Sequence, residues 1–292
     1  MTAPTGVTLP PAWPAGRALA VSVSVMLEQY ADDSAPGIGP MGNPLKAGVL
    51  DLQARSWAEY GPKTGIWRLL DVLAEHDVTA VVYASGLLAE RYPDVMRAIV
   101  AAGHAIAAHG WTQDVIPAYQ TPADEARDVQ RCIAAIAASA GVRPRGWISP
   151  RCTPSASTAG LLRAAGFDWH ADYFGDDLPY AIALPDGELS AVPFTMEVND
   201  LPHAIRYGND PQAFVATLEH LVAGYAAPSR PACMDITVHA HVYGRPAGSI
   251  AFGEALALVR KHERSAFLTN HQSLADAFFP GRTPKGSSAP GA

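Results

Sequence analysis

The sequence contains little cysteine, no basic cluster and no long apolar run, and each absence excludes a class of protein. The 3 cysteines are an odd number without a CxxC pair, which argues against a cysteine zinc site and favours a reducing, cytoplasmic setting. Cys152 has no evident base beside it, so we expect a small buried residue rather than a nucleophile. The net charge is −7 and the lysines and arginines are scattered, so we expect no nucleic-acid partner. No stretch approaches the roughly 18 apolar residues of a membrane-spanning helix.

The N-terminus also lacks the charged and apolar regions of a secretory signal. We expect an extended, proline-rich arm over residues 1–16, a single catalytic domain over 17–280 and a disordered tail over 281–292. With 292 residues, 49% of them hydrophobic, the chain is long enough to bury a barrel-sized core in one domain.

What the sequence does contain is a regular alternation of strand-like and helix-like segments. Apolar, β-branched runs predict strands at 19–27, 78–84, 105–108, 144–149, 167–174, 233–242 and 266–269. Apolar residues at helical spacing predict helices at 65–76, 89–102, 121–140, 155–165, 211–226, 250–262 and 271–279. Shorter β-like pieces are expected at 181–184 and 189–193, and a long loop at 35–48. This alternation, without a GxGxxG turn, favours an α/β fold with a (β/α) barrel over a doubly wound dinucleotide-binding sheet.

Residues able to carry chemistry stand at the ends of these strands. In chain order they are Glu28, His109, Pro150, Arg151, Asp172, His239 and His241. Because the carboxyl ends of barrel strands open onto one face, we expect these side chains to converge there. A carboxylate and two or three imidazoles in a cleft can activate water and protonate a leaving nitrogen. Arg151 adds a cation that can hold an oxyanion.

Several of these residues also have a purely structural interpretation. A glutamate that ends a strand, as Glu28 does, is often only solvated, and a lone histidine after a strand is often a hydrogen-bonded structural residue. Arg151 stands just before a helix start and suits a capping role. His239 and His241 alternate along one predicted strand, so they are expected to face the same side of the sheet.

The succession of these motifs resembles the polysaccharide deacetylase homology family. The motifs are the acid Glu28 after the first strand, His109-Gly110, the segment 146–151 (GWISPR), the segment 161–180 and the segment 239–246 (HAHVYGRP). The similarity extends from about Arg17 to Phe279. The resemblance implies a deformed (β/α) barrel, here of about seven βα units.

Two departures from the family's usual metal site narrow the resemblance to one branch. Metal-dependent members have an Asp-Asp pair at the first strand end and an HxxxH pair at the third, but this chain has Glu28-Gln29 and, four residues after His109, Gln113. An amide is a poor zinc ligand. The pattern is similar to metal-independent allantoinases and cyclic imide hydrolases, and the segment 40–63 looks closest to the imidase side. The resemblance therefore implies no cofactor; if a divalent metal such as zinc is bound, His109, His239 and Glu28 are the candidate ligands.

The resemblance implies a hydrolase that opens a cyclic imide or cyclic amide to a half-amide, through attack of water on a ring carbonyl. We expect Glu28 to activate the water, and His109 or His239 to protonate the departing nitrogen or to stabilise the oxyanion. Substrate-binding side chains are expected at Trp111, Pro150, Arg151, Asn199, Asp200, His241 and Tyr243. The expected partner is a small cyclic imide or ureide, and a homo-oligomer, dimer or tetramer, is expected.

Three other functions stay open at this point. An allantoinase would share the same motifs. A metal-dependent N-deacetylase of amino sugars would need a rearranged metal site. A non-catalytic binding protein would have no reason to keep Glu28, His109 and His239 together at strand ends. A panel of cyclic amides and an N-acetylglucosamine oligomer, assayed with and without a chelator, separates these alternatives.

Overall fold

A computed structural model describes residues 13–37, 39–41, 45–46, 48–225 and 231–280 of the chain. The expected tail, 281–292, and most of the expected N-terminal arm lie outside the described residues. From Trp13 onward the chain is part of the folded body, because the Trp13 ring is buried and its indole N–H donates to the Ala232 carbonyl.

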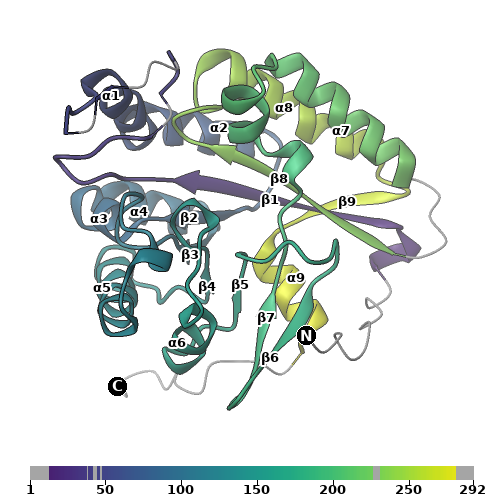
Figure 1. Ribbon diagram of the computed structural model, residues 1–292. Helices are drawn as coiled ribbons and strands as arrows, with labels where there is room; N and C mark the ends of the chain where they lie inside the picture. The colour runs from purple at the N-terminus through teal and green to yellow at the C-terminus, as the bar shows by residue number, and fades with distance from the viewer. Residues whose placement is uncertain (1–12, 38, 42–44, 47, 226–230, 281–292) are drawn as a thin grey trace.

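One sheet curls through the molecule as a deformed barrel, as the sequence predicted (Figure 1). In the described part of the chain its strands have the order β6-β7-β5-β4-β3-β2-β1-β8, with β9 also beside β1. All pairings are parallel except the β6–β7 hairpin. The strands are β1 (Leu19–Leu27), β2 (Val81–Ala84), β3 (Ala105–Ala108), β4 (Gly146–Trp147), β5 (Trp169–His170), β6 (Tyr180–Leu184), β7 (Gly187–Ala191), β8 (Ala232–His239) and β9 (Ala266–Thr269).

Helices cover the outer face of this sheet. Figure 1 shows α7 and α8 over β8 and β1, and α3, α4 and α5 beside β2 and β3. The helices are α1 (Leu52–Tyr60), α2 (Ile66–Glu75), α3 (Gly86–Arg91), α4 (Pro93–Ala101), α5 (Pro122–Ala140), α6 (Thr158–Ala164), α7 (Pro211–Tyr225), α8 (Pro246–Lys261) and α9 (His271–Phe278). Thr121 caps α5 as expected, because its Oγ1 accepts from the Asp124 N–H.

Strand β1 separates two hydrophobic layers because its side chains alternate between the two faces of the sheet. Val21, Val23 and Val25 point to the layer under the helices. Ala20 and Met26 point to the barrel interior. Every residue of β1 is buried, which explains why the strand shows no polar alternation in the sequence.

The register of the parallel strands creates the site. Leu27 pairs with Ala84, Ala84 with Ala108, and Ala108 with Trp147. The residues that follow these partners therefore leave the sheet at one edge. On the other side of β1, Met26 pairs with His239, so β8 ends at the same level. Glu28 and His109, 81 positions apart, meet at this edge.

Several element boundaries differ from the sequence prediction, and three of these differences have a clear local reason. The helix expected over 89–102 is two helices, α3 and α4, separated at Tyr92, because Pro93 disfavours the helical conformation in the residue before it. The strand expected over 233–242 ends at His239, where the His239 carbonyl accepts from the N–H groups of Val242 and Tyr243 and closes a turn. The last long helix starts at Pro246 rather than at residue 250, since proline suits the first helical position.

Helix α1 was not predicted from the sequence. Its N-terminus is capped by Asp51, whose carboxylate accepts from the Ala54 N–H. The helix runs into the π-helical turn Gly61–Gly65, where Gly65 lies so close to the Ala240 carbonyl that a Cβ would stand 1.8 Å from its oxygen. Gly61, at the start of this turn, packs on the segment that carries His241, because a Cβ there would stand 3.4 Å from the His241 backbone nitrogen.

A polar cluster fills part of the barrel interior. The Asp235 carboxylate is fully buried and accepts from the hydroxyl groups of Ser22 at 2.5 Å, Ser24 at 2.9 Å and Thr237 at 2.6 Å. His271 Nε2 lies 3.1 Å from the same carboxylate. Buried polar groups are tolerated when they are hydrogen-bonded in this way.

Candidate active site

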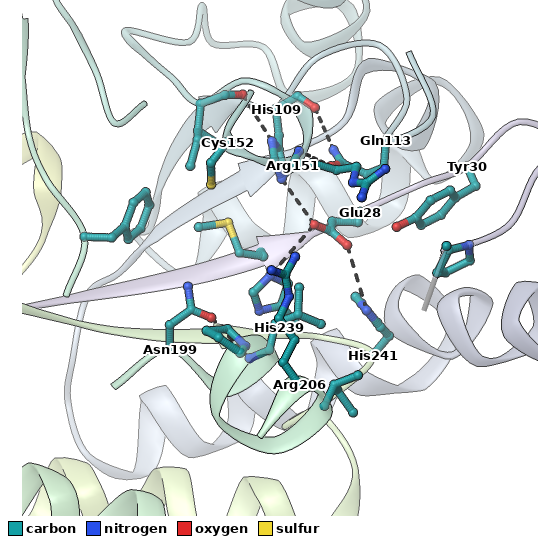
Figure 2. Close-up of a pocket in the computed structure, with 18 of the residues that line it drawn as sticks. Glu28, Tyr30, His109, Gln113, Arg151, Cys152, Asn199, Arg206, His239 and His241 are labelled. Carbon is teal, nitrogen blue, oxygen red and sulfur yellow. Dashed lines mark hydrogen bonds and ion pairs between the residues drawn. The ribbon is translucent and has the colours of Figure 1, made fainter. Parts of the chain in front are cut away.

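A pocket of about 430 Å³ opens at the carboxyl edge of the sheet. Glu28, His109, His239 and His241 line it, and they come from the ends of β1, β3 and β8 (Figure 2). The volume suits a small ligand such as a substituted five- or six-membered ring. The expected convergence of strand-end residues is therefore seen for these four side chains and for Arg151.

Glu28 stands at the centre of the site with three imidazole rings around it. Its Oε1 lies 3.3 Å from His109 Nε2 and 3.8 Å from His239 Nε2, and its Oε2 lies 3.8 Å from His241 Nε2. Burial alone would raise the pKa of this carboxyl group. The His109 hydrogen bond and the electrostatic interactions with the histidines, that with His239 foremost, together outweigh burial and lower the pKa to about 2. Glu28 is therefore an anion at any physiological pH.

His109 is held between two acceptors. Its Nδ1 lies 3.1 Å from the Ile148 carbonyl, and its Nε2 faces Glu28. A carbonyl and a carboxylate only accept, so a ring nitrogen that hydrogen-bonds to either of them does so as a donor. Gly110 follows with φ 67°, and a Cβ there would stand 2.3 Å from the Pro150 ring. Glycine is thus required where the chain turns away from His109.

His239 is backed by the fully buried Asp200. The Asp200 carboxylate lies 2.6 Å from His239 Nδ1, and its second oxygen accepts the N–H of His239 at 2.8 Å and of Tyr243 at 3.1 Å. Burial works to lower the pKa of His239, but the Asp200 charge and hydrogen bond, with Glu28, raise it above its ordinary value. His239 therefore keeps a proton on the nitrogen bonded to Asp200 and directs Nε2 toward Glu28.

His241 differs from the other two histidines because no acid supports it. Its ring meets Trp57 edge-on at 4.5 Å, and its Nδ1 has no hydrogen-bond partner among the described residues. Burial lowers its pKa to about 4, although Glu28 works in the opposite direction. His241 is therefore neutral at physiological pH.

Gln113 does not supply a metal ligand in this arrangement. Its amide nitrogen donates to the His109 carbonyl at 3.0 Å and to Ser85 Oγ at 3.3 Å, and its Oε1 accepts from the Arg151 N–H at 3.4 Å. Among the described residues, no group of three or more His, Cys, Asp or Glu side chains is arranged to hold a metal ion. These side chains, as they are arranged, do not fit a metal ion.

Arg151 lies in a strained turn at the pocket wall. Arg151 and Cys152 both have positive φ, 54° and 50°, which is unusual for residues with a Cβ. Such backbone costs of order 1–3 kcal/mol and is often found at functional sites. Protein atoms around the Cys152 sulfur raise the pKa of this thiol to about 12. Cys152 lines the pocket, against the expectation of a buried residue, but it stays a protonated thiol.

Some residues that were expected to bind the substrate lie behind the pocket wall instead of lining the pocket. Of the described residues, Trp111, Pro150, Asp200 and Tyr243 do not line the pocket. The Trp111 ring is buried against Gly86 and lies under the Arg131 guanidinium at 3.4 Å, while Tyr243 packs on Phe214. Asn199 and His241, by contrast, do line the pocket. The four residues behind the wall therefore position the turns that carry the histidines and Arg151.

The strand-end residue Asp172 is also a supporting residue. Its carboxylate is buried and accepts from the Ser149 N–H at 2.6 Å and from the Ser149 hydroxyl at 2.9 Å. These bonds fix the chain just before Arg151.

Tyr30 and Arg206 are two of the pocket residues that were not predicted from the sequence. Tyr30 stands two residues after Glu28, and its place beside a strand-end acid was a usable signal. Burial, helped by the Glu28 charge, raises the pKa of the Tyr30 phenol, so it remains a hydrogen-bond donor. Arg206 ends the irregular turn Leu201–Arg206, and no periodic pattern marks it.

The fold and the site define a deformed (β/α) barrel with a carboxylate–histidine centre at its carboxyl edge. Residues 58–170 match the family model described as polysaccharide deacetylase. A Schizosaccharomyces pombe protein named "Putative polysaccharide deacetylase" is 27% identical over 80% of this chain and 82% of its own length.

Solved structures agree with this match. A probable polysaccharide deacetylase from Pseudomonas aeruginosa superposes with a TM-score of 0.84 at 26% identity, covering 93% of this chain and 94% of that one. A PuuE allantoinase superposes with a TM-score of 0.83 at 26% identity, with the same coverage of each chain. This chain is therefore similar in sequence and fold to polysaccharide deacetylases, and the structures that it resembles include an allantoinase, as the sequence motifs indicated.

No helix in the described part of the chain is long and apolar enough to cross a membrane.

Proposed function

We propose that this protein hydrolyses the ring of a cyclic imide or cyclic amide to a half-amide. The observation that supports the proposal most strongly is the Glu28 carboxylate, buried at the floor of a small pocket with the Nε2 atoms of His109, His239 and His241 within 3.3 to 3.8 Å. A cyclic imide carbonyl is more electrophilic than a sugar acetamide, because its nitrogen lone pair is shared between two carbonyls. A positioned base and a proton donor supply what its hydrolysis needs.

In this proposal Glu28 orients the attacking water and accepts its proton. The low pKa makes the carboxylate a weak base as long as it faces the imidazole rings directly. The His109 contact, at 3.3 Å, is longer than a strong charge-assisted hydrogen bond, and the other two contacts are longer still. A water bound between the carboxylate and these rings weakens the contacts that lower the pKa, and Glu28 becomes a better base.

His239 acts as the acid. It keeps its Nδ1 proton on Asp200 and presents a protonated Nε2 to the pocket, where it delivers a proton to the departing ring nitrogen. His109 keeps its Nδ1 on the Ile148 carbonyl, and its Nε2–H, which the bound water separates from Glu28, stabilises the oxyanion that forms on the carbonyl. Neutral His241 and the Tyr30 hydroxyl offer further hydrogen bonds to the ring.

A second candidate function is allantoin hydrolysis. The similarity to the PuuE allantoinase, at a TM-score of 0.83, favours a five-membered ureide as the substrate. The same residues would perform this reaction, since allantoin also contains a ring amide. Imide and ureide activity therefore differ in the ring accepted rather than in the mechanism.

We also propose that the protein is a homo-oligomer of two or four copies. Large apolar side chains are exposed in the segment before and at the start of α1, including Met41 and Leu52, each 68% exposed. Exposed apolar groups of this kind often lie at subunit contacts.

The test of the proposed function is a hydrolysis panel with the full-length protein. Succinimide, glutarimide, hydantoin, allantoin and an N-acetylglucosamine oligomer are incubated before and after exhaustive chelation. Opening of at least one ring by the chelated protein is the expected result. Activity on the acetylated oligomer alone, lost on chelation and restored by zinc, would instead identify a metal-dependent deacetylase. Failure to convert any substrate would leave the protein without the proposed activity.

A further inference from the structure

Two arginines line the pocket without protein partners for their guanidinium groups. In the part of the chain that the structure describes, neither the Arg151 nor the Arg206 guanidinium makes a hydrogen bond or ion pair. Other arginines are engaged: Arg145 contacts Asp168 at 2.5 Å and Asp276 at 2.8 Å, and Arg68 donates to Tyr60 at 2.7 Å. Figure 2 shows Arg151 and Arg206 on either side of Glu28 and His239.

Both arginines lie on backbone segments that are connected to residues of the site. The Arg151 N–H donates to Gln113, and its carbonyl accepts from the Thr153 hydroxyl at 2.9 Å, which fixes the strained turn. Arg206 ends the turn that begins directly after Asp200, the residue that holds His239. The starting points of the two side chains are therefore fixed relative to Glu28.

The two cations lie at the outer end of the pocket, and the reacting groups lie at its floor. Arg151 and Arg206 are exposed, whereas Glu28 is 8% and His109 only 2% exposed. Apolar side chains, including Phe174 and Ile205, line the same pocket. A ligand whose ring reaches Glu28 therefore leaves its other end near the guanidinium groups rather than near the reacting carbonyl.

The acidic residues of the pocket do not neutralise Arg151 and Arg206. Among the described lining residues the acids are Glu28, surrounded by histidines, and Asp114. Asp114 Oδ1 accepts the Ala31 N–H at 2.9 Å and makes no ion pair with either arginine. A cationic ligand would meet two unpaired guanidinium groups at the mouth, while an anion would meet donors suited to a planar carboxylate.

Resting on the ring-opening function above, we propose that the substrate is an anionic cyclic amide, whose ring carries a carboxylate-bearing substituent held by Arg151 and Arg206. The carboxylate orients the ring with one carbonyl over Glu28. Binding energy from this remote group is then used to position the reacting bond.

Matched substrate pairs test the inference by activity. Hydantoin is compared with hydantoin-5-acetate, and succinimide with 3-(carboxymethyl)succinimide. We expect kcat/KM to be at least about tenfold higher for the carboxylated member of a pair. Arg206→Gln and Arg151→Gln should each remove most of that preference, measured as the ratio of kcat/KM between the two members of a pair. Arg264→Gln, at an exposed arginine outside the pocket, is the matched control and should keep the preference.

A binding measurement separates this inference from the proposed function. Cyclopentylacetate and the neutral cyclopentylacetamide contain no ring amide, so their affinity for the wild-type protein is measured by calorimetry whether or not any ring is opened. Tighter binding of the carboxylate, weakened by added salt and by Arg206→Gln, supports the anion site even if the hydrolysis panel fails. Equal affinity for both compounds, or a preference that survives both arginine substitutions, overturns the inference.

Discussion

Three histidines surround one carboxylate, and their different partners give them different protonation states. His239 is backed by Asp200, His109 by a backbone carbonyl, and His241 by the edge of Trp57. The pKa of His239 is raised and that of His241 falls to about 4. One site thus holds a proton donor and a neutral imidazole beside the same anion, a separation of roles typical of acid–base catalysis.

Asp200→Asn tests the role of the buried acid. The substitution removes the charge that raises the pKa of His239, so the proton donor is lost at a lower pH. We expect the alkaline limb of the kcat/KM profile to move to lower pH, with kcat reduced on the order of 100-fold. A reduced kcat with an unmoved alkaline limb would show that Asp200 acts only through structure.

His241 contributes a pH dependence to stability. Its pKa is about 4 in the folded protein and 6.5 ordinarily, so the unfolded chain takes up a proton first as the pH falls. The stability associated with neutral His241 is present above pH 6.5 and is lost as the pH falls toward 4, at about 1.4 kcal/mol for each unit of pKa difference. His239, whose pKa is raised, changes the stability in the opposite direction as the pH falls. The contribution of His241 is therefore measured by comparing the wild type with a variant that lacks this histidine.

Urea unfolding of the wild type and of His241→Gln at pH 7 and pH 4.5 measures the contribution of His241 to the pH dependence of stability. The free energy of unfolding should fall less on acidification in the variant. His220→Gln, at an exposed helix position, should behave as the wild type. An identical fall in all three proteins would mean that the pKa of His241 is the same in the folded and the unfolded chain.

Much of this site could be predicted from the sequence, because parallel strands that start in register also end together. Glu28, His109, His239 and Arg151 each follow or end an apolar run, so their convergence followed from the fold. Arg206 could not be found in this way, since it lies on an irregular turn whose path is set by Asp200 far along the chain from Glu28. The sequence also cannot tell which residues face the pocket and which, like Trp111, pack behind its wall.

At the scale of elements, β1, β3 and β9 have the bounds predicted from the sequence, β4 and β5 are shorter than predicted, and α1 was not predicted. The strand over residues 19–27 was expected with its exact bounds, because nine consecutive buried residues leave a continuous apolar signal. β4 and β5 have only two residues each, shorter than the segments predicted over 144–149 and 167–174. Their positions depend on neighbours in the sheet rather than on their own pattern.

The Asp235 cluster is the element-scale feature most sensitive to substitution. Asp235→Ala on β8 would leave the hydroxyl groups of Ser22, Ser24 and Thr237 without their buried acceptor. We expect a loss of about 3 kcal/mol in the free energy of unfolding, measured by urea denaturation. Asp71→Ala, at an exposed position of α2, should change the stability by less than about 0.5 kcal/mol. A change equally small for Asp235→Ala would contradict the structural role of the cluster.

At the scale of the whole molecule, the barrel brings residues from distant parts of the chain to one edge. Glu28 is 81 positions from His109, and His239 lies 39 positions from Asp200. The floor of the pocket is buried and carries the acid–base groups, while its mouth carries two exposed cations. This polarity from mouth to floor allows the same molecule to select a ligand at one end and react with it at the other.

The most direct test of the proposed mechanism is kcat/KM of Glu28→Gln on the best ring substrate, measured after chelation. Glutamine keeps the size of the side chain and removes the charge that binds and deprotonates water. We expect a loss of about 1,000-fold or more with a folded protein by circular dichroism, while Glu75→Gln, at an exposed position, keeps full activity. Activity of Glu28→Gln within threefold of the wild type, about 0.7 kcal/mol in barrier height, would contradict the role of Glu28 as the base.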